Sequence, residues 1–136
     1  MNARTPLLLS LGALVALSGC DEFRLLGSGK ICTASVERAL EVRVEDAVSG
    51  QPIAQGATGW ARDGAFTDSL SVVGWDGSGG EMTATTLGGV YERPGRYDIQ
   101  IQRPGYAGWD TTGVRARKGS CHVETVRLVA RLKPLP

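Results

Sequence analysis

The chain has 136 residues, with 15 Lys and Arg against 14 Asp and Glu and a formal net charge of +1. This length suits one domain with one hydrophobic core. The balanced charge, without a block of either sign, argues against nucleic acid as a partner and against a polybasic surface for membrane attachment.

The chain begins with the pattern of an export signal. Leu7–Leu17 is an apolar run of eleven residues, interrupted only by Ser10 and Gly12, after a short segment with one positive charge. A bilayer span needs roughly twenty apolar residues, whereas the apolar segment of a secretory signal has about this length. A buried core helix is the alternative, but no amphipathic periodicity supports it.

The run ends in LSGC, residues 17–20, which resembles the lipobox of bacterial lipoproteins. The resemblance implies that residues 1–19 are removed and that a diacylglycerol is attached to the Cys20 sulfur. Several acyl chains hold a protein at a membrane far better than one chain does. We therefore expect a lipoprotein of the bacterial cell envelope, on the periplasmic side or the cell surface. A free thiol in an ordinary secreted protein is the alternative.

The next residue, Asp21, resembles the signal that retains lipoproteins in the inner membrane of enteric bacteria, so the choice between inner and outer membrane stays open. Residues 20–30 form the predicted anchor and a flexible tether, because Gly27-Ser28-Gly29 closes this segment. Residues 31–136 form the predicted folded domain. The predicted leader holds one basic and no acidic residue, so the 117 residues after it are formally neutral.

Two cysteines remain for the folded domain, Cys32 and Cys121. An oxidising compartment favours a disulfide between them. Such a bridge closes a loop of about 90 residues and contributes roughly 4–5 kcal/mol in the chain-entropy model. The alternative, two metal or catalytic thiols, lacks partners because His122 is the only histidine.

Period-two alternation of apolar and polar residues predicts strands through the rest of the chain. The clearest is 96–103, which places Tyr97, Ile99 and Ile101 on one face between two Pro-Gly turns. Residues 74–80 are predicted to form a glycine-rich loop. The other expected strands are 40–45, 57–62, 66–73, 82–87, 114–117 and 121–132. The strand at 66–73 is a weaker candidate, and 82–87 is a Thr-rich stretch.

The last of these strands has a change of parity, which predicts a bulge or a change of face near Thr125. About seven short strands with regular turns and no convincing helix predict an all-β fold. We expect an antiparallel β-sandwich or barrel with Greek-key connections and one disulfide.

Two stretches resemble carboxypeptidase regulatory-like domains, which belong with the transthyretin-like sandwiches. LEVRVEDAVSGQPIAQGATGWARDG, residues 40–64, is similar to the first half of such a domain, and GRYDIQIQRPGY, residues 95–106, to the second half. The resemblance implies a transthyretin-like sandwich. Domains of this family are mostly non-catalytic folding aids, spacers and binding modules, so it says little about a specific activity.

The search for chemistry gives few candidates. His122 is expected to be a satisfied or exposed side chain, and we expect no catalytic residue, no cofactor and no enzyme activity. The segment Asp76–Glu81 faintly resembles a calcium loop, but a plain loop is the alternative because it supplies only two carboxylates.

Aromatic residues are the more informative candidates for binding. Trp75, Tyr106 and Trp109 fall in or beside predicted turns, where an exposed ring could stack on a sugar. The alternative is that Tyr106 and Trp109 cover one end of the sandwich and that Trp60, on a strand, lies in the core.

The functional prediction is a non-catalytic, lipid-anchored module that interacts with another envelope protein. Edge strands of an open sandwich offer unpaired backbone groups for such contacts. A carbohydrate-binding lipoprotein that uses exposed tryptophans is the alternative.

Overall fold

The computed structural model describes residues 31–78 and 80–136, and Cys32–Pro136 form one compact unit. The predicted leader, Cys20 and the tether up to residue 30 lie outside the described residues. The described part of the chain consists of seven strands joined by turns and contains no helix. None of its segments is therefore a helix of the length and apolarity that crossing a membrane requires.

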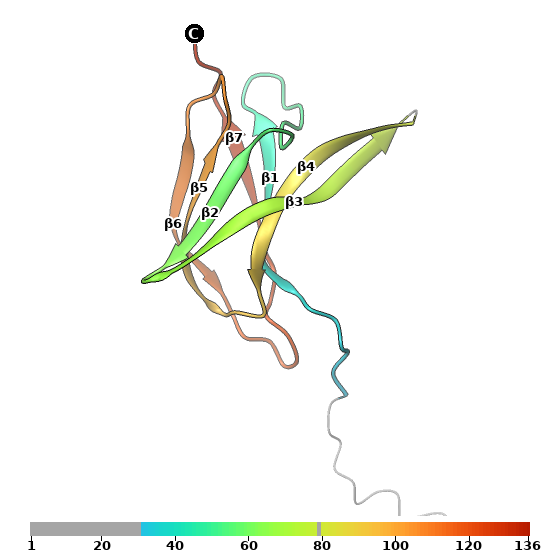
Figure 1. Ribbon diagram of the computed structural model, residues 1–136, viewed down its shortest axis with the longest axis vertical. Coiled ribbons are helices and arrows are strands. Elements are labelled where there is room, and N and C mark those ends of the chain that lie inside the picture. The colour runs from blue at the N-terminus through green and yellow to red at the C-terminus, as the bar shows by residue number, and fades with distance from the viewer. Residues whose placement is uncertain (1–30, 79) are drawn as a thin grey trace, which may run out of the picture. The chain divides into compact units, whose positions relative to one another are not determined.

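Figure 1 shows the seven strands of the domain. They are β1 (Arg38–Asp46), β2 (Thr58–Asp63), β3 (Phe66–Ser78), β4 (Glu81–Tyr91), β5 (Gly95–Gln102), β6 (Trp109–Ala116) and β7 (Val126–Leu132).

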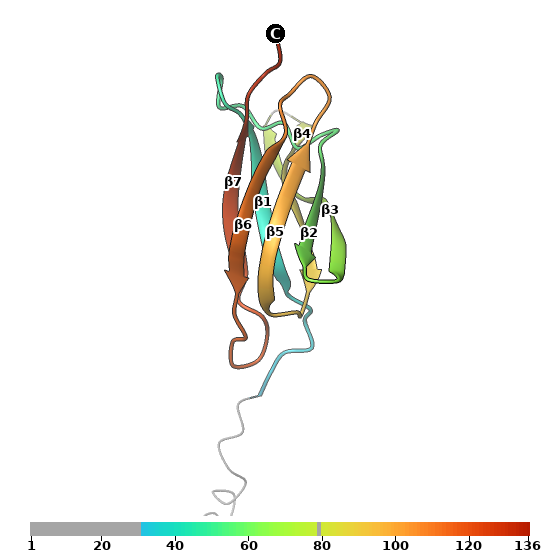
Figure 2. The same ribbon diagram turned by 90° about the vertical axis from the view of Figure 1, so that its left-hand side faces the viewer.

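The strands form one sheet in the order β6-β5-β2-β3-β4-β1-β7. This sheet folds over at β3 to give the two layers of the sandwich. Residues 66–70 of β3 pair with β2, whereas residues 71–78 pair with β4, so one strand belongs to both layers of the sandwich. Figure 2 shows β6, β5 and β2 in front of β1 and β4. The order β5-β2-β3-β4 is that of a Greek key, which confirms the predicted connectivity.

One strand pair departs from the predicted antiparallel arrangement. β1 and β7 are parallel, with Leu40 opposite Val126 and Asp46 opposite Leu132, whereas the other five pairs are antiparallel. The chain leaves β6 at the end of the sandwich where β1 begins, and the segment 117–125 crosses there to the other layer. β7 therefore starts beside the start of β1 and must run in the same direction.

The core lies between the two layers and follows the alternation seen in the sequence. The predicted inward face of β5, formed by Tyr97, Ile99 and Ile101, is confirmed, because all three side chains are completely buried. β1 supplies the opposite side of the core, and each such side chain contributes roughly 1.5–3 kcal/mol on burial. The buried residues of β1 are Ala39, Leu40, Val42 and Val44.

The predicted disulfide is confirmed. Cys32 and Cys121 are bonded with their Cα atoms 5.4 Å apart, and the bridge closes a loop with a sequence separation of 89. It therefore fixes the first residues of the domain to the segment between β6 and β7.

The predicted glycine-rich loop at residues 74–80 is wrong. β3 continues through Ser78, and β4 starts at Glu81. A Cβ atom at Gly74 would come within 2.7 Å of the Thr86 Cβ, so glycine is needed here for the close approach of two strands. The strand register shifts on both sides of Gly74, which marks an irregularity in the β3–β4 pair.

The last two strands also differ from their predicted bounds. β6 begins at Trp109, five residues before the predicted start, and β7 begins only at Val126. Before β7, Val123 is buried and bridges Lys118 instead of extending the strand. The predicted change near Thr125 is therefore the point where the chain leaves this crossing segment and enters β7.

Candidate functional site

A two-stranded projection formed by parts of β3 and β4 exposes two large apolar side chains. We call residues 71–78 of β3 and 81–85 of β4 the ribbon; Figure 1 shows it leaving the body of the domain. Trp75 is 49% exposed and Met82 is 62% exposed. Trp75 lies opposite Ala84, and Met82 lies opposite Gly77, so both side chains are on the same face of the ribbon.

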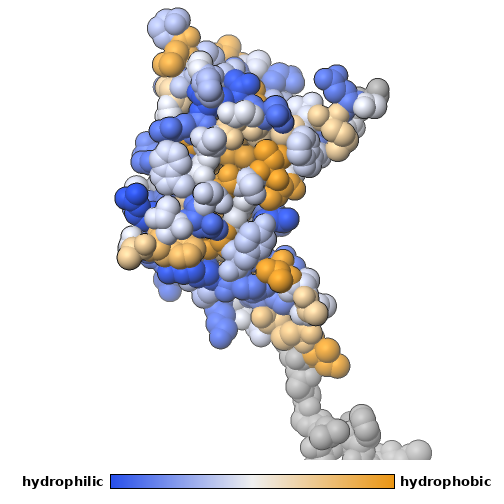
Figure 3. Space-filling model, viewed as in Figure 1, coloured by the Kyte–Doolittle hydropathy of each residue, from blue (hydrophilic) through white to orange (hydrophobic). Residues whose placement is uncertain are grey.

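The outer edges of the ribbon lack strand partners in the described chain. β2 pairs with β3 only up to Leu70, and β1 pairs with β4 only from Thr86 onward. Both ribbon strands therefore offer backbone N–H and C=O groups to a further strand. Figure 3 shows apolar residues exposed over β3 and β4 near the base of the ribbon.

The two terminal strands of the pairing order are joined to each other at one end of the sandwich. β6 and β7 contact each other, and the segment after β7 is bonded to the β5–β6 loop. The N–H of Ala107 donates to the Lys133 carbonyl at 2.8 Å, and the N–H of Leu135 donates to the Gly105 carbonyl at 2.9 Å. These bonds join the segments just outside β6 and β7. The ribbon differs from these two strands because it exposes Trp75 and Met82 together on one face.

Tyr106, predicted as a possible sugar platform, has a structural role. Its hydroxyl donates to Oδ2 of Asp46 at 2.8 Å, and the Arg103 guanidinium lies 4.9 Å from its ring centroid. Oδ1 of Asp46 accepts from the backbone N–H groups of Val48 and Ser49, each at 2.8 Å. These bonds, with Ser49 first and Tyr106 next, lower the pKa of Asp46 to about 2.

Trp109 opens β6 opposite Ile101 and is half-buried against the core. Tyr106 precedes it by three residues, so both belong to one loop and strand start, whereas Trp75 lies on the ribbon. The structure does not bring the three predicted aromatic residues together into one platform.

The structure contradicts the alternative that Trp60 lies in the core. Its neighbours Gly59 and Ala61 face the core, so Trp60 points to the outer face of β2 and is only half-buried. A Cβ atom at Gly59 would come within 2.6 Å of the Ile101 side chain, which excludes a larger inward residue. The Gly-Trp-Ala pattern indicates the outward position of Trp60, because the small residues on either side of it fit the tightly packed inner face.

The outer face around Trp60 contains a hollow of about 170 Å³. A flat ring beside carboxylate and amide groups can stack on a sugar and bind its hydroxyls. The residues that line it are Trp60, Arg62, Asp98, Ile99, Gln100, Asp110, Thr111 and Thr112.

The opposite end of the domain from the ribbon tip is tightly fastened. We call this the basal end: residues 32–38, 91–96 and 115–126. Glu92 accepts hydrogen bonds from the Glu37 N–H at 2.8 Å and the Val123 N–H at 3.2 Å, and its Oε1 lies 2.7 Å from Nδ1 of His122. The backbone bond from Glu37 is the largest cause of the lowered pKa of Glu92.

The other ring nitrogen of His122, Nε2, lies 3.2 Å from the Thr33 hydroxyl. The expected satisfied histidine is therefore confirmed. A hydroxyl, an imidazole and a carboxylate follow one another here, as they do in hydrolase triads. The same carboxylate also fastens two backbone segments, which is a structural use of this group.

In the segment Asp76–Glu81, which resembles a calcium loop in sequence, the carboxylate of Asp76 already faces a cationic side chain. Asp76 lies 3.3 Å from Arg43, which also bonds Glu45 at 2.9 Å. No group of three or more potential metal ligands among His, Cys, Asp and Glu occurs in the described residues.

Comparison with known proteins adds no relative. No protein-family model matches the chain, and no curated protein matches it. The similarity to carboxypeptidase regulatory-like domains and to the lipobox thus stays a prediction from the sequence.

Proposed function

We propose that this protein is a non-catalytic module of the bacterial cell envelope, anchored by lipid on Cys20, that docks onto another envelope protein through the ribbon. The observation that carries the proposal is the ribbon itself. It has two unpaired edges and exposes Trp75 and Met82 on one face. The partner is a protein that adds a strand to an edge of the ribbon and receives these side chains in an apolar pocket.

The Greek-key topology supports the proposed kinship with carboxypeptidase regulatory-like, transthyretin-like domains, most of which bind rather than catalyse. The environment of His122 supports the same assignment. Its partner Glu92 accepts two backbone N–H groups, so we assign the Thr33, His122 and Glu92 cluster to fastening the basal end.

The docking proposal is tested with a photo-crosslinking residue placed at Met82 of the lipidated protein in its native envelope. The matched control is the same residue at Val129, which is 44% exposed on the outer face of β7. We expect one protein to be captured from position 82 and not from position 129. The purified partner should then bind the wild type and lose at least about tenfold in affinity with Met82→Lys. Equal capture from both positions would contradict docking through the ribbon.

The anchor is tested separately. Cys20→Ser should abolish incorporation of labelled palmitate and leave the leader uncleaved. Palmitate labelling that persists in this variant would overturn the lipobox assignment without affecting the ribbon.

The hollow beside Trp60 favours a second candidate function, carbohydrate binding. This candidate moves the predicted sugar contact from Trp75, Tyr106 and Trp109 to the outer face of β2. Titration with peptidoglycan fragments or plant polysaccharides should shift the tryptophan fluorescence, and Trp60→Ala should remove the shift while Trp75→Ala retains it. A shift that survives Trp60→Ala would reject this site.

A further inference from the structure

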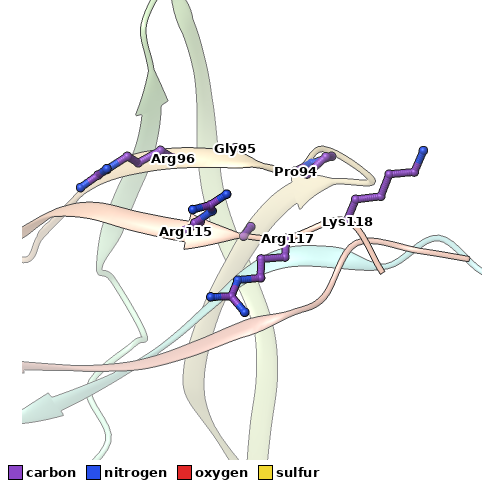
Figure 4. Close-up of a pocket in the computed structure, with 7 residues that line it drawn as sticks. Pro94, Gly95, Arg96, Arg115, Arg117 and Lys118 are labelled. Carbon is purple, nitrogen blue, oxygen red and sulfur yellow. The ribbon is translucent and has the colours of Figure 1, made fainter. Parts of the chain in front are cut away.

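Four cationic side chains gather at the basal end of the β5–β6 pair. Arg96 lies on β5, Arg115 on β6, and Arg117 and Lys118 directly after β6. With Pro94, Gly95 and Ala116, they line an open hollow of about 610 Å³ (Figure 4). No carboxylate of the described residues lines this hollow.

No ion pair among the described residues neutralises the four cations. Arg96 and Arg115 lie directly opposite each other in the strand register, and like charges in that position destabilise a strand pair. None of the four takes part in an ion pair within the described chain, whereas nearby Arg93 bonds Asp63 at 2.8 Å. Anions from outside the protein would offset this repulsion.

The arrangement of the side chains indicates what kind of anion fits. Figure 4 shows Arg96, Arg117 and Lys118 pointing in different directions from the hollow. Side chains that spread apart do not converge on one bound phosphate. They match a surface that carries many anionic groups, and guanidinium groups are well suited to phosphate oxygens.

The position of the hollow identifies that surface. Cys121 follows Lys118 by three residues and is bonded to Cys32, so the cations lie close to where the chain enters the domain. The predicted lipid on Cys20 would hold this point near a membrane. The tip of the ribbon, between Ser78 and Glu81, lies at the other end of β3 and β4 from the basal end.

We propose that the four cations rest on anionic phospholipid headgroups of the membrane that holds the anchor, so that the ribbon points away from the membrane. This inference rests on the proposed lipid anchor. It replaces the expectation from the balanced charge that the protein has no basic surface for membrane attachment. The cations of β5 and β6 are separated by 18 residues or more in the sequence, and only strand pairing brings them together.

The proposal is tested on the chain from Asp21 onward, which lacks the acyl chains. Every residue of the hydrophobic core lies between Ala39 and Leu132, so this chain retains the core and the disulfide. Binding to phosphatidylcholine vesicles with and without phosphatidylglycerol is measured by co-sedimentation at low salt. We expect binding only to the vesicles with phosphatidylglycerol, weakened by added salt.

Two double variants of equal net charge separate the surface from overall charge. Arg115→Gln with Arg117→Gln should lower the partition constant about 25-fold, since each cation near an anionic surface contributes about fivefold. The control, Arg131→Gln with Lys133→Gln, removes two charges at the far end of β7 and should change it less than about twofold.

Three results would overturn the proposal. They are equal losses in both double variants, no binding to the anionic vesicles, and release from them by inorganic phosphate at constant ionic strength. The last result would identify a site for free phosphate. None of these results depends on the acylation of Cys20, so failure of the anchor and failure of the basic surface are distinguishable.

Discussion

The basal end and the ribbon are built in opposite ways. At the basal end, a disulfide and the bonds of Glu92 join three segments that are far apart in the sequence. The ribbon is joined to its neighbours through the β3–β4 ladder and the exposed pair of Asp76 with Arg43, and an exposed pair contributes only about 0–1 kcal/mol. The protein is therefore rigid where its chain enters and adaptable where it offers a surface.

The largest effect on stability should come from the disulfide at the basal end. Replacing both Cys32 and Cys121 by Ser should lower the free energy of unfolding by about 2–5 kcal/mol, because the unfolded chain loses a long cross-linked loop. Urea denaturation with and without reducing agent measures this, and the reduced wild type should behave like the double variant. A loss below about 1 kcal/mol would mean that the basal end does not depend on its bridge.

A smaller effect is expected from the hydrogen bonds between Tyr97 and Arg93, next to the basal end. The buried Tyr97 hydroxyl donates to the Arg93 carbonyl and accepts from the Arg93 guanidinium, both at 2.8 Å. Tyr97→Phe should lower the free energy of unfolding by about 1–2 kcal/mol, since it leaves these partners unsatisfied. Tyr91→Phe is the control, because the Tyr91 ring is half exposed and its hydroxyl makes no hydrogen bond in the described chain. An equal loss in both variants would contradict the explanation.

The end of the sandwich opposite the basal end, where β1 finishes at Asp46, can be tested by pH. Since the folded pKa of Asp46 is about 2 and its ordinary value is 3.8, its stabilisation is present above about pH 4 and disappears as the pH falls toward 2. Asp46→Asn should remove this part of the acid dependence, as measured by denaturation midpoints at successive pH values. The control Asp110→Asn, at an exposed carboxylate, should keep the wild-type profile.

The smallest effect on stability is expected at the ribbon. Trp75→Ala with Met82→Ala should change the free energy of unfolding by less than about 1 kcal/mol, because much of each side chain is exposed. The same variant should lose the proposed partner in the capture experiment. A large loss of stability would show that these side chains support the fold instead of offering a surface.

Strands with a simple alternation could be predicted from the sequence, and the ribbon could not. β5 alternates without interruption between two Pro-Gly turns, so its inward face was clear. In the ribbon, GWDGSGG has the composition of a loop. Glycine at Gly74 and Gly77 instead makes room for Thr86 and Met82 on the paired strand, a tertiary requirement that local composition does not reveal.

The candidate surfaces depended even more on strand register. The outward position of Trp60 follows from which neighbours face the core, and the basic surface follows from the pairing of Arg96 with Arg115. Each residue is unremarkable in the sequence alone. Of these features, only the disulfide could be predicted directly, because the predicted export signal and the number of cysteines left Cys32 and Cys121 as natural partners.

The disulfide also decides how the domain would carry mechanical load. A pulling force applied to the chain before Cys32 and to the segment after β7 passes through the sulfur atoms to Cys121. Residues 33–120 are bypassed, so such a force could lengthen only the short stretch from Cys121 onward. While the bridge is intact, β1 to β6 cannot be drawn out along this line, and reduction would expose all of them to the load.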